Sequence, residues 1–182
     1  MGFGLLVIGY ISVLGVLPYS FLYYGWGVYT AITGGLAMLA GLCRLEEYNI
    51  FFRAAKYIII VYILILLGFP PFLLFSRTEE TMASFMIVSK IIRLCVLFAF
   101  HYFLLSGISS LAKEINNEKI EKKTKRNIYM TYIFFSAFIL EFLNVPAIFG
   151  GLFIISFVYY ALIVSNLYSC YMRITYEEEN RR

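Results

Sequence analysis

The sequence predicts an all-α integral membrane protein, a bundle of six transmembrane helices with both termini in the cytoplasm. Of the 182 residues, 62% are hydrophobic and only 14% are charged, against about 45–50% apolar and about 25% charged residues in soluble domains. The apolar residues gather in runs along the whole chain, and the basic residues gather between alternate runs. The first observation predicts burial in a membrane, and the second predicts how the helices are oriented.

Six apolar segments can each form a membrane crossing within a single domain over residues 1–182. An apolar helix of about 20 residues spans a hydrocarbon core of about 30 Å. The segments are 4–24, 28–43, 57–75, 82–112, 128–143 and 147–172. Segments 28–43 and 128–143 give only about 24 Å of helix each, so they must borrow flanking residues, or one of them forms a re-entrant hairpin. Segment 82–112 is long, so we expect it to tilt or to project into the cytoplasm.

The distribution of basic residues supports six crossings. With six, twelve of the fifteen Lys and Arg residues fall on the side of the two termini, and Arg77 falls in a loop on the opposite side. This bias is typical of cytoplasmic loops, so it predicts a multi-pass plasma-membrane protein with both termini cytoplasmic. No N-glycosylation sequon is present and the outer loops are short, which favours a compact bacterial protein. The twelve residues are Arg44, Arg53, Lys56, Lys113, Lys119, Lys122, Lys123, Lys125, Arg126, Arg173, Arg181 and Arg182.

The composition excludes several kinds of chemistry. The chain has one His, three Cys residues without a C-x-x-C pair, and no Asp, so we expect no metal site and no cofactor. Basic residues are too few for a nucleic-acid-binding domain. His101 and Ser109 lie two helical turns apart, too far for a nucleophile and its base. We therefore expect no enzymatic activity and no nucleic-acid partner.

Three ionisable residues of the fourth segment share one helical face: Lys90, Arg93 and His101. A charge at mid-membrane costs at least about 2.5–3.5 kcal/mol unless it has a partner or water, so this face should point into the bundle. Glu141 lies at a comparable depth in the fifth segment. We predict that Glu141 pairs with Lys90 or Arg93, near Asn144, in a polar pocket in the outer half of the bilayer.

An alternative places these charges at the membrane surface. In it, the fourth crossing begins near Arg93, residues 81–93 lie along the interface, and Glu141 reaches outward to the headgroups. His101 has no partner nearby in the sequence, although Asn166 has a similar depth in the sixth segment. His101 can be a packed, hydrogen-bonded residue or a proton relay.

Glycines and prolines predict where helices approach closely and where they break. Gly27, Ala31 and Gly35 recur at four-residue spacing, with Gly34, Ala37 and Gly41 beside them, which allows neighbouring backbones to come close. The consecutive prolines Pro70 and Pro71 remove two amide donors from one helical turn. We expect a broken helix there, lined by protein or water, or a kink near the end of a helix.

The second loop, residues 43–57, is expected to form an amphipathic helix along the inner membrane surface, because its apolar residues recur at helical spacing. Within residues 35–57, the patterns G-L-x-x-L and L-E-E-Y-N-x-x-F-R-x-A-K resemble uncharacterised small polytopic membrane proteins of Gram-positive bacteria. The resemblance brings no activity with it. Such a helix could bind a protein partner.

Two classes of function therefore remain. The first is a small transport or solute-binding protein that uses the outer polar pocket, with Lys90, Arg93 and Glu141 as ligand or coupling groups. The second is a membrane scaffold, regulator or accessory subunit that binds a partner through its cytoplasmic loops. In both, the lipid bilayer is the main partner, and a protein partner or a homo-oligomer is possible.

Overall fold

The computed structural model describes residues 2–14, 26–75, 79–138 and 146–180, and all of these ranges are helical apart from short turns. The predicted all-α class is therefore confirmed for the described part of the chain. Its helices are α1 (Gly2–Leu14), α2 (Trp26–Leu45), α3 (Ile50–Phe75), α4 (Glu79–Glu114), α5 (Glu118–Phe138) and α6 (Pro146–Asn180).

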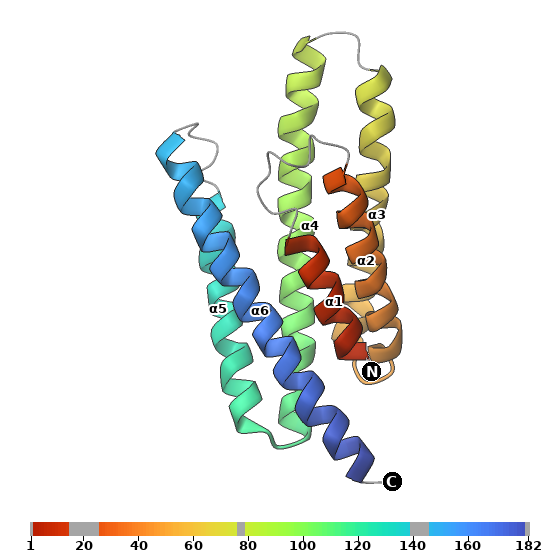
Figure 1. Ribbon diagram of the computed structural model, residues 1–182, viewed down its shortest axis with the longest axis vertical. Helices are drawn as coiled ribbons and strands as arrows, with labels where there is room; N and C mark the ends of the chain where they lie inside the picture. Colours follow the sequence, from red (N-terminus) through yellow and green to blue (C-terminus); the bar gives the residue numbers. More distant parts are fainter. Residues whose placement is uncertain (1, 15–25, 76–78, 139–145, 181–182) are drawn as a thin grey trace.

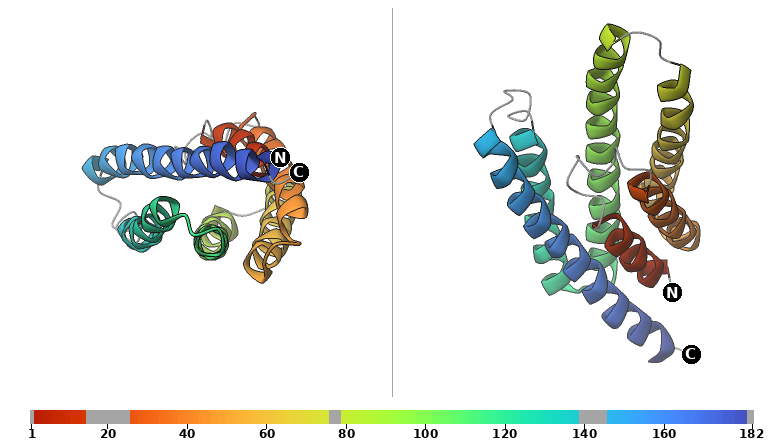
Figure 2. Two further views of the ribbon diagram at one scale, coloured as in Figure 1. Left: turned by 90° about the horizontal axis from the view of Figure 1, so that it is seen from below. Right: turned by 45° about the horizontal axis from the view of Figure 1, so that its top comes forward.

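The helices pack in a closed ring. Each helix contacts the next one along the chain, and α6 contacts α1 to complete the circle. Figure 1 shows the chain ends at the same end of the bundle, and Figure 2 shows the ring viewed from that end. Because every helix has two neighbours, one face of each helix points toward a shared centre.

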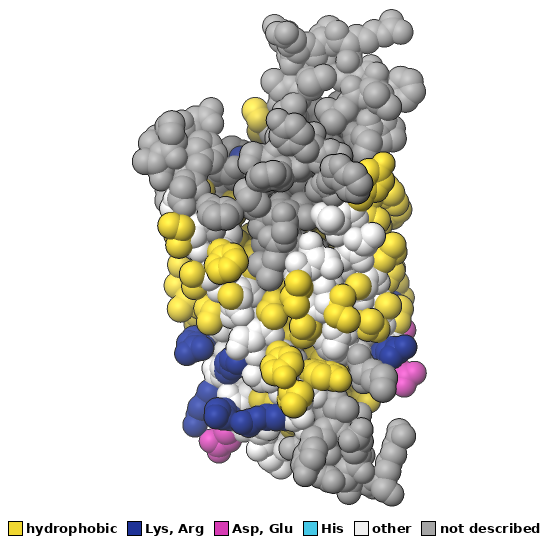
Figure 3. Space-filling view, viewed as in Figure 1, with side chains coloured by type: hydrophobic (Ala, Val, Ile, Leu, Met, Phe, Trp, Pro, Cys, Tyr) yellow, Lys and Arg dark blue, Asp and Glu magenta, His cyan; other side chains and the backbone are white. Residues whose placement is uncertain are grey.

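Three helical stretches are long and apolar enough to cross a membrane: Ile50–Gly68, Ile87–Glu114 and Ile154–Arg173. Gly2–Ser12 and Tyr29–Leu45 are apolar but shorter. Large apolar side chains such as Leu64, Ile133 and Phe157 point outward and are more than half exposed, as expected of a surface that faces lipid. Figure 3 shows hydrophobic side chains around the middle of the bundle, with most Lys and Arg side chains toward the end that carries the termini. By their length and composition, three helices of the described part could each cross a membrane, which fits a multi-pass membrane protein.

The helix boundaries correct several of the expected segments. α2 has 20 residues, or about 30 Å, so segment 28–43 does borrow flanking residues. α5 begins at Glu118, ten residues before segment 128–143, because its polar first turns are helical as well. α1 has 13 residues, or about 20 Å, and the rest of segment 4–24 is outside the described residues.

α4 is the longest helix, with 36 residues, or about 54 Å. Its extra length lies at the Glu79 end, where α3 and α4 rise above the other helices and away from both chain ends (Figure 1). The expectation that this segment tilts or projects into the cytoplasm stays a prediction. The helix is extended by Glu79 and the following residues, which precede the apolar run.

The second loop does not form a separate surface helix. α2 ends at Leu45, residues 46–48 form a turn, and α3 starts at Ile50 and continues through the apolar span. Asn49 caps α3, because its Oδ1 accepts a hydrogen bond from the backbone N–H of Phe51 at 2.6 Å. The apolar face that we expected on the membrane surface packs inside the bundle instead, with Phe52 fully buried against Phe3.

Glycines bring α1 and α2 into close contact, and the glycines that α2 contributes are Gly34 and Gly41, beside the expected series of Gly27, Ala31 and Gly35. A Cβ added to Gly9 would lie 2.7 Å from the backbone oxygen of Gly34, and one added to Gly41 would lie 2.7 Å from that of Gly2. Gly35 faces Ile63 of α3 instead. Glycines seven residues apart on each helix therefore form the contact.

The backbone of α3 stays helical through Pro70 and Pro71 to Phe75, so the expected break is not present there. Pro146 is the first residue of α6, a position where its missing N–H leaves no helical hydrogen bond unmade. Pro18 is outside the described residues. The two prolines of α3 lie within two turns of its end, which agrees with the alternative of a helix-end effect.

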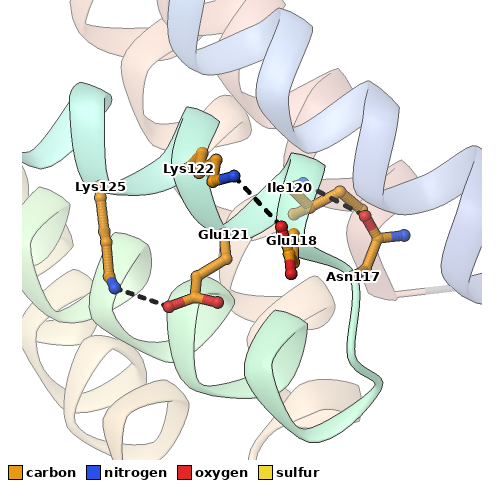
Figure 4. A network of polar contacts seen from close by, with 6 residues as sticks. All are labelled: Asn117, Glu118, Ile120, Glu121, Lys122 and Lys125. Atoms are coloured by element: carbon orange, nitrogen blue, oxygen red, sulfur yellow. Dashed lines mark hydrogen bonds and ion pairs between the residues drawn. The ribbon is translucent and has the colours of Figure 1, made fainter.

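The turn between α4 and α5 is built by two asparagines. Asn116 adopts a left-handed backbone with φ of 55°, and the N–H of Asn117 donates to the Ala112 carbonyl at 2.9 Å, which closes the end of α4. Asn117 then caps α5 by accepting from the N–H of Ile120 at 3.2 Å (Figure 4). This short turn fixes α4 and α5 as antiparallel neighbours.

Candidate functional site

His101 lies at the centre of the helical ring. It is 1% exposed, and its Nδ1 lies 2.7 Å from the Leu97 carbonyl oxygen, one turn earlier in α4. A carbonyl oxygen only accepts, so Nδ1 carries the hydrogen and, in the neutral ring, Nε2 is an acceptor. Nε2 is buried and has no hydrogen-bond partner among the described residues.

Aromatic rings enclose His101. Five ring centroids lie 5.5–5.7 Å from the centroid of the imidazole. They come from α1, α4, α5 and α6, so residues far apart in the sequence meet at this point. The five residues are Tyr10, Phe100, Phe135, Tyr159 and Tyr160.

A small cavity adjoins the imidazole. Its volume is about 10 Å³, which is about the room that one water molecule needs. Tyr10 lines it together with His101, and the Tyr10 hydroxyl is also buried and has no hydrogen-bond partner among the described residues. Tyr10 can donate and His101 Nε2 can accept, so the cavity offers a matched pair of polar groups in an apolar setting. The other lining residues are Gly35, Met38, Ile59, Tyr62, Leu97, Phe100 and Tyr160.

The structure places Lys90 and Arg93 on the same helix as His101. Residues 81–93 continue α4 without a break, so they do not form the separate interfacial segment of our alternative. Lys90 and Arg93 are both half-buried. The Nε of Arg93 donates to the Ser89 carbonyl at 3.4 Å, and the guanidinium interacts electrostatically with Tyr62 of α3. Arg93 thus faces a helix that lines the cavity.

The predicted ion pair of Glu141 with Lys90 or Arg93 stays a prediction. Glu141 and Asn144 are outside the described residues, so their positions relative to α4 are not given. The half-burial of the two cations agrees with a face that points partly into the bundle. Each of them takes part in an interaction within the structure.

Polar side chains continue between α5 and α6, on the side of the chain ends. Asn166 is fully buried, and its Nδ2 donates to Thr124 Oγ1 at 3.0 Å. Asn127 Nδ2 donates to the Leu162 carbonyl at 3.4 Å. The side-chain oxygens of both asparagines are buried and lack a partner among the described residues. Asn166 therefore binds α5 and makes no hydrogen bond with His101, whose depth it was expected to share.

A hydrogen bond joins this polar seam to the aromatic rings around His101. Thr131 Oγ1 lies 2.8 Å from the hydroxyl of Tyr159, and the ring of Tyr159 stacks on Phe134 at 4.2 Å. We define the polar seam as Thr124, Asn127, Thr131, Tyr159 and Asn166. Together with the cavity, it gives a series of buried polar groups from the centre of the bundle toward one end.

The sequence held a signal for the polar seam that the charges concealed. Every third or fourth residue of α5 is buried, and the first four of these are Ile120, Thr124, Asn127 and Thr131. This spacing marks one face of a helix. The Lys and Glu residues between them dominate the pattern of this segment, so the polar residues on the buried stripe were not predicted to matter. Tyr10 gave no signal, because a tyrosine in an apolar run is unremarkable.

The remaining candidates for chemistry do not cluster. Cys43 and Cys95 are exposed and Cys170 is buried, and all three are free thiols, so Cys43 and Cys170 do not form a disulfide. Among the described residues there is no group of three His, Cys, Asp or Glu side chains that could hold a metal ion. The chemistry of the cavity therefore depends on uncharged hydrogen-bonding groups.

Comparison with known proteins does not assign the chain to a family. No family model, no curated protein and no solved structure matches it. A functional assignment therefore has to come from the geometry of the site.

Proposed function

We propose that the chain is a plasma-membrane protein with six crossings and both termini in the cytoplasm, which binds and transports a small polar solute. One observation carries the proposal: Tyr10 and His101 both line a cavity at the centre of the helical ring, and each has a buried polar atom without a hydrogen-bond partner among the described residues. Leaving a buried polar group unpaired costs about 1–3 kcal/mol. Two such atoms beside one cavity indicate a bound molecule with hydrogen-bonding groups.

Polar groups on both sides of the cavity support a route through the bundle. Arg93 lies two turns from His101 along α4 and faces Tyr62, which lines the cavity. In the proposal, Lys90, Arg93, Glu141 and Asn144 form the outer entrance. The polar seam between α5 and α6 forms the inner part of the route, because two of its amide oxygens are free to accept hydrogen bonds.

The two cavity groups define the chemistry of the solute. Tyr10 donates a hydrogen bond, and Nε2 of His101 accepts one. A hydroxyl group satisfies both at once, as does water. The cavity has room for about one water molecule, so the surrounding aromatic rings must move apart to admit the carbon skeleton of a small alcohol or polyol, for which they supply apolar surface. We therefore expect a small hydroxyl-bearing solute.

Swelling of reconstituted vesicles tests this function. Vesicles that contain the protein are mixed with a gradient of glycerol or another small polyol, and light scattering follows solute entry. We expect faster entry than in protein-free vesicles. Tyr10→Phe should slow the protein-dependent part by about fivefold, because it removes one hydrogen bond of about 1 kcal/mol and leaves the packing in place.

Tyr29→Phe is the matched control, because Tyr29 is 67% exposed on the surface of α2. It should leave the rate unchanged. Entry at the protein-free rate for folded wild-type protein with every polyol tested would contradict the proposal. So would equal rates for wild type and Tyr10→Phe.

A further inference from the structure

The exposed side chains of α5 change character along the helix and so locate one membrane surface. Lys122, Lys125 and Arg126 are exposed in its first turns. One turn later Tyr129 is 70% exposed, and Ile133 is 63% exposed after another turn. Tyrosines at the boundary between charged and apolar surface are typical of the headgroup region. Arg126 therefore lies at the depth of the lipid headgroups, near the end of the bundle where Figure 3 shows the basic side chains.

Four cations from two helices gather at this depth. Lys119, Lys123 and Arg126 lie at positions i, i+4 and i+7 of α5, which places them on one stripe of the helix. Arg173 comes from α6, at the end of its apolar span. Lys119, Arg126 and Arg173 are the cations that act electrostatically on Lys123. We call these four residues the cationic cluster.

Lys123 is held in place at the base of the cluster. Its Nζ donates to the Ser165 carbonyl at 3.0 Å, to Ser165 Oγ at 3.1 Å and to Ser169 Oγ at 3.0 Å. An ammonium group has three N–H donors, so all of them are used on α6. Lys123 then contributes charge to the cluster, and for the other three cations no hydrogen bond or ion pair is given among the described residues.

The carboxylates of this helix are used elsewhere. Glu118 pairs with Lys122 at 3.1 Å and Glu121 pairs with Lys125 at 2.6 Å, both on the neighbouring stripe (Figure 4). Lys122 and Lys125 are thus neutralised within α5. Partial burial lowers the pKa of the Lys123 ammonium, and the positive charges of Arg126, Arg173 and Lys119 lower it further, while Cys170 acts in the opposite direction.

We propose that the cationic cluster binds the phosphate group of an anionic lipid at the membrane surface. The cluster gathers positive charge at headgroup depth, and its cations come from two adjacent helices that form one side of the ring. Arg126 and Arg173 can each present a planar fork to phosphate oxygens. Basic pockets between transmembrane helices are suited to such headgroups. The membrane, and not a soluble anion, supplies phosphate at this depth.

Lipid titration of the purified protein tests the proposal. Phosphatidylglycerol is added to the protein in a neutral detergent, and native mass spectrometry measures its affinity, with phosphatidylcholine as the neutral comparison. Arg126→Gln with Arg173→Gln should weaken phosphatidylglycerol binding about 25-fold, because each cation near an anionic surface contributes about fivefold. Binding of phosphatidylcholine should not change.

Lys122→Gln with Lys125→Gln is the matched control, since it removes the same number of positive charges from the neighbouring stripe. It should weaken phosphatidylglycerol binding less than fivefold. Arg126→Lys with Arg173→Lys keeps the charge and should retain most of the affinity, which guards against a folding defect in the glutamine variant.

Equal losses in the two glutamine pairs, or no loss in either, would overturn the proposal. Displacement of the lipid by an equal concentration of glycerol phosphate would overturn it as well, because it would identify a soluble anion as the ligand. The solute experiment does not depend on these results.

Discussion

Nδ1 of His101 lies 2.7 Å from the carbonyl oxygen of Leu97, and this contact fixes which ring nitrogen faces the cavity. The chain has one histidine, so the nitrogen-15 NMR spectrum of histidine-labelled protein reports on this ring alone. We expect a protonated Nδ1 and an unprotonated Nε2, because a buried cation without a charged partner is costly. Addition of the transported solute should shift the Nε2 resonance. A spectrum with Nε2 protonated and Nδ1 free would contradict the arrangement.

His101→Phe separates the role of the nitrogens from that of the ring. The backbone N–H one turn after Leu97 still reaches its carbonyl, so no buried acceptor is left unpaired, and the aromatic packing is kept. We expect the free energy of unfolding to change by about 1 kcal/mol or less, while solute entry into vesicles falls by about tenfold. Retention of the wild-type entry rate would show that His101 serves packing alone.

Gly9→Ala tests the close contact of α1 and α2. The added Cβ would lie 2.7 Å from the Gly34 backbone oxygen and 2.5 Å from the side chain of Met38, so the helices must separate. We expect a loss of about 1–3 kcal/mol, measured by denaturation in mixed detergent. Gly151→Ala is the control, because nothing lies within 4 Å of its added Cβ. Equal stability of the two variants would contradict the predicted contact.

A double-mutant cycle tests the hydrogen bond between Thr131 and Tyr159. Thr131→Val and Tyr159→Phe each remove one hydroxyl, and the combination removes both. Interhelical hydrogen bonds in membrane proteins contribute about 0.6 kcal/mol on average and up to about 1.7 kcal/mol. We expect a coupling free energy in that range from equilibrium unfolding. Additive losses would mean that the two hydroxyls do not stabilise each other.

Asn116 provides a test of the turn between α4 and α5. With φ of 55°, a residue with a Cβ carries a penalty of about 1–2 kcal/mol, which asparagine partly avoids. Asn116→Ala should therefore lower the free energy of unfolding, and Asn116→Gly should be at least as stable as wild type. If the glycine variant is no more stable than the alanine variant, the left-handed conformation does not determine the turn.

The sequence predicted the helical class, and three of its six expected crossings coincide with helices long and apolar enough to span a membrane, because hydrophobic runs determine both. It placed helix ends poorly, since polar residues at the ends of α4 and α5 continue the helix beyond the apolar run. The second loop was misread because helical spacing shows that a segment has an apolar face but not what that face packs against. Phe52 packs on Phe3 of α1, a contact between distant segments that spacing cannot reveal.

The candidate site was predicted in part. His101 stood out as the one histidine within an apolar segment, and its burial is confirmed. The sequence did not identify Leu97 as its hydrogen-bond partner, because the acceptor is a backbone carbonyl one turn earlier in the helix and not a side chain. Tyr10 and the polar seam were missed because uncharged residues in a membrane segment become significant only when the fold shows that their polar atoms are buried and unpartnered. The prediction for Glu141 and Asn144 remains to be tested.

Labelling with a membrane-impermeant maleimide tests the central claim, that the six helices cross the membrane with the termini and the turn before α5 in the cytoplasm. Single cysteines are placed at Glu114, Thr78 and Arg182 in a variant whose three native cysteines are replaced. We predict that Thr78→Cys reacts in intact cells, whereas Glu114→Cys and Arg182→Cys react only after the membrane is permeabilised. Reaction of Glu114→Cys in intact cells, or positions 114 and 182 on opposite sides of the membrane, would contradict the account.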